Sequence, residues 1–177
     1  LAVLPCTGDK INRYRRTLEN IFKSLLPSQT MPSAYALKDG DKKITKGNFE
    51  HVKCINLACH ESENLYLTDE VLAQLGTTWE DAKIKIKSES SKYGRKSKKL
   101  SEADTWERKT VDIKNVIREL SVILDGKHVP WTVRVGKCIG EKRPTGQLAE
   151  FLGDNLVNAL WGKITADIPE SNLIAVS

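Results

Sequence analysis

The sequence has no long apolar segment, and this absence limits the kinds of protein that the chain can form. A transmembrane helix needs about 20 consecutive apolar residues, and no run in the 177 residues approaches that length. The apolar opening "LAVLP" (residues 1–5) is too short for the core of a signal peptide, and no basic residue precedes it. We therefore predict a protein that has no transmembrane segment and is not secreted.

Cysteine is also scarce. The four cysteines are too sparse for a disulfide-stapled domain, so we interpret them as reduced thiols in a cytoplasmic or nuclear protein. Cys54, Cys59 and His60 in "CINLACH" are weak zinc-ligand candidates, because a gap of four residues between cysteines occurs in zinc sites. No second paired cluster accompanies them, and free cysteines usually pack as small apolar residues. We predict neither a metal nor a cofactor.

Motifs that identify a reaction are missing too. The segment "GEKRPTG" (residues 140–146) has the glycines of a phosphate loop but lacks the Gly-Lys-Ser/Thr ending. No local pattern marks a catalytic cysteine–histidine pair. We predict no catalytic residues, and an enzyme that processes nucleic acid or a phosphorylated substrate stays an alternative hypothesis.

Strands and helices do not alternate along the chain, which argues against a doubly wound parallel sheet. Apolar residues at helical spacing predict three substantial helices, at residues 9–26, 101–125 and 147–161. The predicted fold class is α+β, with a small, mainly antiparallel sheet packed against these helices. The length suits a single domain spanning residues 1–177.

Strands are predicted where short apolar runs or alternating patterns occur, at residues 49–59, 65–67 and 129–140. Asp39-Gly40 lies between two short apolar runs and indicates a hairpin, because glycine tolerates the positive φ of tight turns. These segments would supply the antiparallel sheet.

What the sequence does contain is one concentrated run of positive charge, "KIKIKSESSKYGRKSKK" (residues 83–99). This run holds eight basic residues and one acidic residue, a net charge of +7. The whole chain carries 28 basic and 23 acidic residues, a net charge of +5, so the other 160 residues have a net charge of −2. Charge confined to one segment attracts a polyanion or an anionic membrane to that segment.

Serine and glycine in the second half of the run predict an exposed loop or arm at about residues 88–100. Flexible lysines neutralise phosphates without reading sequence, Arg95 can bind a phosphate through two N–H groups, and Tyr93 can stack on an unpaired base. We predict a non-enzymatic nucleic-acid-binding domain, with RNA or a single strand favoured. The predicted contact residues are Lys83, Lys85, Lys87, Lys92, Tyr93, Arg95, Lys96, Lys98 and Lys99.

The segment before the run predicts two short helices joined by a turn at Gly76. Thr68 can cap the first helix, and Thr78 with Asp81 resembles a capping box for the second. A DNA-reading helix-turn-helix is disfavoured, because the second helix lacks the Asn, Gln and Arg side chains that read base edges. We interpret the two helices as structural.

Four further cations form a predicted secondary basic surface: Arg13, Arg16, Lys142 and Arg143. The apolar tail "NLIAVS" and the four tryptophans, of which Trp79 and Trp161 lie near helix ends, suggest self-association, so the domain is predicted to act as an oligomer. The alternative from another class is a self-assembling basic structural protein, like a viral matrix or coat protein, that binds anionic membrane or nucleoprotein. A nuclear-import signal or a solubilising loop would explain the basic run without any of these functions.

Overall fold

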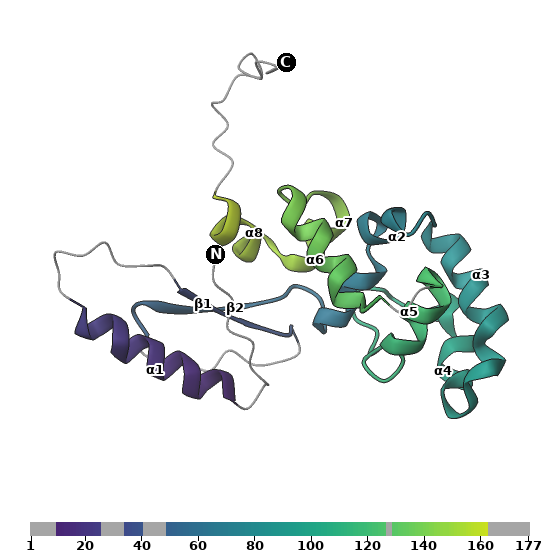
Figure 1. Ribbon diagram of the computed structural model, residues 1–177, viewed down its shortest axis with the longest axis horizontal. Coiled ribbons are helices and arrows are strands. Elements are labelled where there is room, and N and C mark those ends of the chain that lie inside the picture. The colour runs from purple at the N-terminus through teal and green to yellow at the C-terminus, as the bar shows by residue number, and fades with distance from the viewer. Residues whose placement is uncertain (1–9, 26–33, 41–48, 127–128, 163–177) are drawn as a thin grey trace, which may run out of the picture.

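The computed structural model describes the chain at residues 10–25, 34–40, 49–126 and 129–162, and most of it is helical (Figure 1). The elements are α1 (Ile11–Ser24), β1 (Ala34–Lys38), β2 (Val52–Asn56), the 3-10 helix η2 (Ser62–Leu67), α2 (Asp69–Gln74), α3 (Trp79–Glu89), the 3-10 helix η3 (Ser90–Lys96), α4 (Ser97–Ser101), the 3-10 helix η4 (Ala103–Thr105), α5 (Ile117–Asp125), α6 (Trp131–Glu141), α7 (Gly146–Leu152) and α8 (Asp154–Trp161). None of the described helices has both the length and the apolar character needed to span a membrane.

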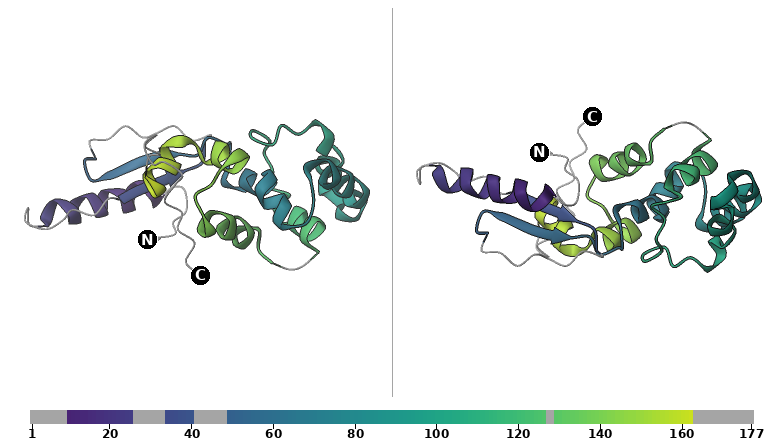
Figure 2. Two further views of the ribbon diagram at one scale, coloured as in Figure 1. Left: turned by 90° about the horizontal axis from the view of Figure 1, so that it is seen from above. Right: turned by 90° about the horizontal axis from the view of Figure 1, so that it is seen from below.

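The strands and the helical part occupy different ends of the molecule. α1, β1 and β2 lie at one end, and α2 to α5 lie at the other (Figure 1, Figure 2). α8 contacts β2, and one cluster of buried side chains extends from Ile55 in β2 to Val157 in α8. The predicted α+β class is confirmed. Of the three predicted helices, α1 and the end of the last one contact β2, whereas α5 packs against α3 and α6.

The sheet is two-stranded and parallel, in a register that pairs Ala34 with Val52. The prediction of a mainly antiparallel sheet was therefore wrong, and so was the hairpin at Asp39-Gly40. The N–H of Leu57 donates to the carbonyl of Lys38 (2.9 Å), which continues the parallel ladder beyond both strands, and the N–H of Gly40 donates to the carbonyl of Cys59 (3.1 Å). Glycine is needed there for close approach, because a Cβ at residue 40 would lie 2.1 Å from the Cys59 oxygen.

Residues 129–140 were predicted as a strand, but most of them form the helix α6. The alternation of apolar residues was misleading, since Val133 is 55 % exposed. The side chains that pack into or against the core follow a helical spacing instead: Trp131, Val135, Cys138 and Ile139. Residues 65–67, also predicted as a strand, are buried within the 3-10 helix η2.

The helices were predicted more accurately than the strands, apart from their lengths. The predicted helix at residues 9–26 is α1. The predicted helix at residues 101–125 is confirmed as an α-helix only at α5, because residues 106–116 form an irregular segment. The Asn64 amide holds this segment, donating to the carbonyls of Arg108 (2.8 Å) and Val111 (2.7 Å). The predicted helix at residues 147–161 is divided into α7 and α8 by Gly153, whose φ is +85°.

Candidate nucleic-acid interface

The basic run folds into helical segments: the second half of α3, then η3, then the start of α4. The prediction of an irregular loop or arm at about residues 88–100 was therefore wrong. Serine did not disrupt the helices, because several hydroxyls donate to the carbonyl three residues earlier, as Ser90 does to Lys87 (2.7 Å) and Ser101 to Lys98 (2.8 Å). We call η3 and α4 (residues 90–101) the basic tip.

The basic tip is anchored to the protein core on both sides. Ile86 in α3 and Leu100 in α4 are both fully buried, and both belong to the main apolar cluster. Between them the chain turns at Gly94, whose φ of +51° suits glycine. The cations of the tip are thus carried on a fixed backbone and not on a flexible arm.

Most cations of the run have a partner within the protein. Five of them bind a neighbouring carboxylate or carbonyl: Lys83 to Glu80 (2.8 Å), Lys85 to the Leu124 carbonyl (3.3 Å), Lys87 to Asp104, Lys92 to Glu89, and Lys96 to Glu119 (2.7 Å). The hydrogen bond from Lys92 to Glu89 raises the pKa of that ammonium, which keeps it charged. Solvent screens pairs of this kind, so they add little stability. They reduce the positive field that the sequence alone suggests.

Arg95 and Lys98 are the exceptions. Both side chains are exposed, and neither forms an ion pair within the part of the chain that the structure describes. Lys99, next to them, lies over the ring of Trp106 with its Nζ 6.0 Å from the centroid. Arg95 and Lys98 are therefore the side chains of the predicted contact set best placed to bind an external anion.

The aromatic side chains near the run already pack against other residues of the protein. Tyr93 is half-buried and packs against the main apolar cluster. Trp79 is flanked by Lys83, with Nζ 5.9 Å from the ring centroid, and by Arg108, with its guanidinium carbon 5.2 Å away. The predicted stacking of Tyr93 on an unpaired base has little support from this geometry.

The predicted secondary basic surface does not adjoin the basic tip. Arg13 and Arg16 are exposed on α1, at the opposite end of the molecule from α4 (Figure 1, Figure 2). Arg143 donates to the Gly162 carbonyl and to Asn158 Oδ1 (2.9 Å), so it closes the C-terminal end of α8. Of the four residues, the structure brings none together with Arg95 and Lys98.

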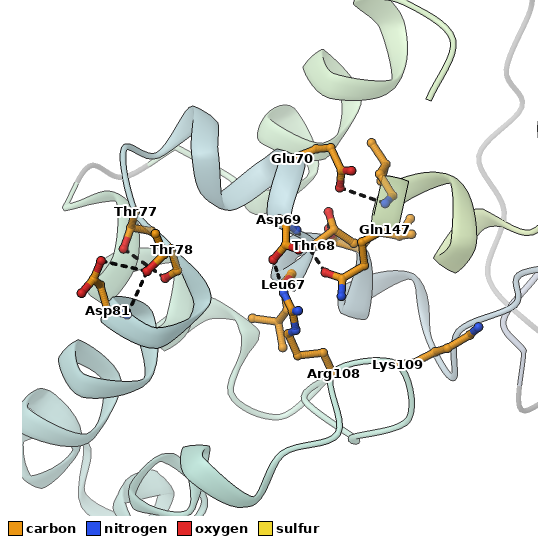
Figure 3. A network of polar contacts seen from close by, with 12 residues as sticks. Leu67, Thr68, Asp69, Glu70, Thr77, Thr78, Asp81, Arg108, Lys109 and Gln147 are labelled. Carbon is orange, nitrogen blue, oxygen red and sulfur yellow. Dashed lines mark hydrogen bonds and ion pairs between the residues drawn. The ribbon is translucent and has the colours of Figure 1, made fainter. Parts of the chain in front are cut away.

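The segment "GEKRPTG" leads into the N-terminus of α7, a place where an anion could bind. A carboxylate of the protein occupies it, because Leu148 N–H donates to Glu70 Oε2 (2.9 Å) (Figure 3). Gly146 admits this carboxylate, since a Cβ at that position would lie 2.2 Å from Glu70 Oε1. The site is thus a contact between α2 and α7.

Arg108 is a structural residue that sequence reasoning missed. Its Nη1 donates to Asp69 (2.6 Å) and to the Leu67 carbonyl (3.0 Å), which ties the irregular segment to the start of α2 (Figure 3). A local pattern could not have found it, because these residues are about 40 positions away in the chain.

The predicted pair of short helices exists as α2 and α3. Thr78 caps α3, accepting a hydrogen bond from Asp81 N–H (3.2 Å) (Figure 3). The first turn of α3 carries Glu80 and Asp81, both exposed. A recognition helix contacts bases through its N-terminal residues, and two carboxylates there would repel phosphates. The pair fits the structural interpretation.

The two cysteines of the zinc hypothesis differ in burial and in hydrogen bonding. Cys54 is half-buried in β2, whereas Cys59 is buried and its thiol donates to the Glu61 carbonyl (3.1 Å). Burial raises the pKa of the Cys59 thiol to about 12, and zinc binds thiolates. Among the described residues, no group of three potential ligands, His60 included, is placed to hold a metal.

Comparison of the chain with protein-family models, with curated proteins and with solved structures gives no match. The function is therefore inferred from the residues and their geometry alone.

Proposed function

We propose that the protein is a non-enzymatic nucleic-acid-binding domain that contacts the phosphate backbone through its basic tip. The observation that carries this proposal is the pair Arg95 and Lys98, exposed and without an ion-pair partner among the described residues. Lys99 lies next to them and adds positive charge. Each neutralised phosphate releases condensed counterions, which gives affinity without base recognition.

A duplex suits the basic tip better than a single strand does. The preference for RNA or a single strand rested on a flexible arm and on a free Tyr93, whereas the run is helical and Tyr93 packs against the core. Cations on a fixed backbone match phosphates that a duplex holds at regular spacing. A partner of this kind would place the protein in the nucleus or the cytoplasm.

The test is a binding titration of the full chain by fluorescence anisotropy over a salt series. The probes are an RNA duplex, a DNA duplex, a single-stranded RNA and phosphatidylserine vesicles. We expect salt-sensitive binding to the duplexes. In the double variant Arg95→Gln/Lys98→Gln, the slope of log K against log salt should become shallower by about 2, because each lost phosphate contact on B-DNA removes about 0.9.

The matched control is the double variant Lys83→Gln/Lys87→Gln. It also removes two positive charges from the run, but from side chains that pair with Glu80 and Asp104. We expect it to retain most of the salt slope. Equal losses in both variants would mean that only overall charge counts, and vesicle binding without nucleic-acid binding would favour the membrane-associated structural protein instead.

A further inference from the structure

Buried charged side chains form the hydrogen bonds that attach α1 to the start of β2, while the apolar contact there comes from Phe22, which lies edge-on to His51. The Glu19 carboxylate accepts hydrogen bonds from the N–H groups of Glu50 (2.8 Å), His51 (3.0 Å) and Val52 (3.0 Å). Arg15 Nε donates to the Val52 carbonyl (2.8 Å). Both charged side chains are buried, with Arg15 5 % and Glu19 3 % exposed.

The apolar stripe of α1 is consequently turned partly toward solvent. Its residues are Ile11, Tyr14, Leu18 and Ile21, at the 3-4-3 spacing of a coiled-coil seam. Tyr14 is 46 % exposed and Ile21 is 49 % exposed, while Ile11 and Leu18 are half-buried. An amphipathic surface helix normally buries such a stripe, but among the described residues no helix fills the seam of α1.

We infer that this seam binds the α1 helix of a second copy of the chain in antiparallel orientation. The spacing is the same when it is read from either end, so a reversed copy meets the seam in register. Ile11 then faces the second copy's Ile21, and Tyr14 faces the second copy's Leu18, which gives four apolar layers from the two chains. An interface of one patch with itself is the usual form of a homodimer.

The side chains beside the seam agree with an antiparallel partner. On one flank of this arrangement Lys10 lies across from the second copy's Ser24, and Thr17 lies across from the second copy's Thr17. On the other flank the two Arg15 side chains lie across from each other, but each is buried in its own chain, where it donates to the Val52 carbonyl. A parallel copy would bring Lys10 toward the second copy's Arg15. The exposed cations Arg13 and Arg16 lie away from the seam on the helix surface and do not oppose either arrangement.

Dimerisation through α1 would leave the basic tip uncovered. α1 lies at the opposite end of the molecule from the basic tip (Figure 1, Figure 2), so a dimer formed through α1 would carry two unobstructed tips. The expected self-association thus has an interface on α1. Of the tryptophans that suggested self-association, Trp106 is buried, and Trp79, Trp131 and Trp161 are half-buried and pack against the core of their own chain. The apolar tail at residues 172–177 lies outside the described residues.

The experiment is sedimentation velocity of the full chain from about 1 to 200 μM. A seam of only four layers is small for a protein interface, so we expect a reversible dimer with a Kd on the order of 10 μM. Ile21→Glu should shift the chain to monomer throughout this range. The matched control is Ile84→Glu, which changes an isoleucine that is 68 % exposed on α3 and should leave the dimer intact.

Orientation is tested by cross-linking with a short bismaleimide. In a Cys6→Ser/Cys54→Ser background, Thr17→Cys should give cross-linked dimers, because the antiparallel seam brings residue 17 of both copies together. Lys10→Cys should not, since residues 10 of the two copies would be about 20 Å apart along the helix axis. The pattern does not depend on nucleic-acid binding, so it can fail or succeed independently of the proposed function.

Three results would overturn the inference. The first is a monomer at every concentration. The second is a dimer that survives Ile21→Glu. The third is a monomeric protein whose melting temperature falls in Ile21→Glu, which would mean that another segment of the same chain covers the seam. Cross-linking of Lys10→Cys as well as Thr17→Cys, which a parallel pair would give, would overturn the antiparallel orientation.

Discussion

At the α3–α4 end of the molecule, charged side chains face solvent and the apolar ones other than Ile84 are buried, whereas at the α1 end the arrangement is partly reversed. Ile86 and Leu100 are fully buried beneath the lysines of the basic run. On α1, by contrast, Arg15 and Glu19 are buried, and Tyr14 is about half exposed. The two segments thus pack against the rest of the chain in different ways: α3 and α4 bury apolar side chains, and α1 buries charged side chains.

The difference lies in what each segment covers. α3 and α4 cover an apolar core, so burial of isoleucine and leucine determines their orientation. α1 covers the start of β2, where backbone N–H and C=O groups need partners, and Glu19 with Arg15 supplies them. Buried ions are costly unless they are hydrogen-bonded, and here the backbone offers those bonds.

The largest effect is expected at the α3–α4 end. Ile86→Ala should destabilise the protein by about 3 kcal/mol, because it leaves a cavity in a fully packed site. The matched control on the same helix is Ile84→Ala, which should change stability by less than about 0.5 kcal/mol, since that side chain is exposed. Urea denaturation of both variants gives the comparison, and similar losses would contradict the assigned faces of α3.

The second effect is expected at the α1 end. Glu19→Gln should weaken the docking of α1, because a neutral amide oxygen replaces a carboxylate that accepts three N–H bonds. Hydrogen exchange of the amides of residues 50–52 should become faster, while that of α3 should not change. Arg16→Gln, at an exposed position of the same helix, is the control. Unchanged exchange in Glu19→Gln would remove the basis of the comparison.

The docking of α1 should also depend on pH in a defined direction. Burial opposes ionisation of Glu19, but the three backbone N–H groups and Lys23 outweigh it, so the pKa of this carboxyl lies below its ordinary value of 4.5. A lowered carboxyl pKa gives stability that is complete above about pH 4.5 and is lost as pH falls through the lower value. The same amides report it, and Glu19→Gln should abolish the dependence.

A smaller effect is expected at the cap of α3. Thr78→Ala should cost about 1 kcal/mol, because the Asp81 N–H loses its acceptor. Thr77→Ala is the control, since its hydroxyl makes only a 3.3 Å bond to the Thr78 carbonyl. Thermal unfolding followed by circular dichroism measures both, and a larger loss in Thr77→Ala would argue against this capping arrangement.

The smallest effect is expected at Glu61, a buried carboxylate whose pKa is shifted in the opposite direction to that of Glu19. Burial raises the pKa of Glu61, in part opposed by Lys114, so its ionised form is disfavoured in the folded state. Stability contributed by this group is therefore complete at low pH and falls as pH rises through the raised pKa, opposite to Glu19. Glu61→Gln should raise the melting temperature slightly at pH 7 and not at pH 4, with the exposed Glu102→Gln as the control. A fall at pH 7 would show that the carboxylate stabilises the fold.

The sequence predicted the features that depend on near neighbours. The helices α1, α2 and α3 follow from local spacing and turn signals, and the Thr78–Asp81 cap follows from residues three positions apart. The run of positive charge at residues 83–99 is also a property of the sequence alone. The secondary structure of that run was mispredicted, because Ile86 and Leu100 hold it against a core that forms only on folding.

Features that depend on distant contacts were missed. The parallel pairing of β1 with β2 requires an approach of Gly40 to Cys59 that no local pattern announces. The irregular segment after η4 is held by Asn64, more than 40 residues earlier. In the candidate interface, pairing with Glu119 and Asp104 decided which lysines are already neutralised.

The sequence by itself thus determined where the positive charge lies and that α1 is amphipathic, because both are properties of composition and spacing. Only the tertiary structure decided that Arg95 and Lys98 are the exposed cations of the run without an ion pair among the described residues, and that α1 docks by its charged flank. The physical reason is the same in both cases. Whether a charged side chain forms an ion pair or hydrogen bond within the protein depends on partners that folding brings to it from distant parts of the chain.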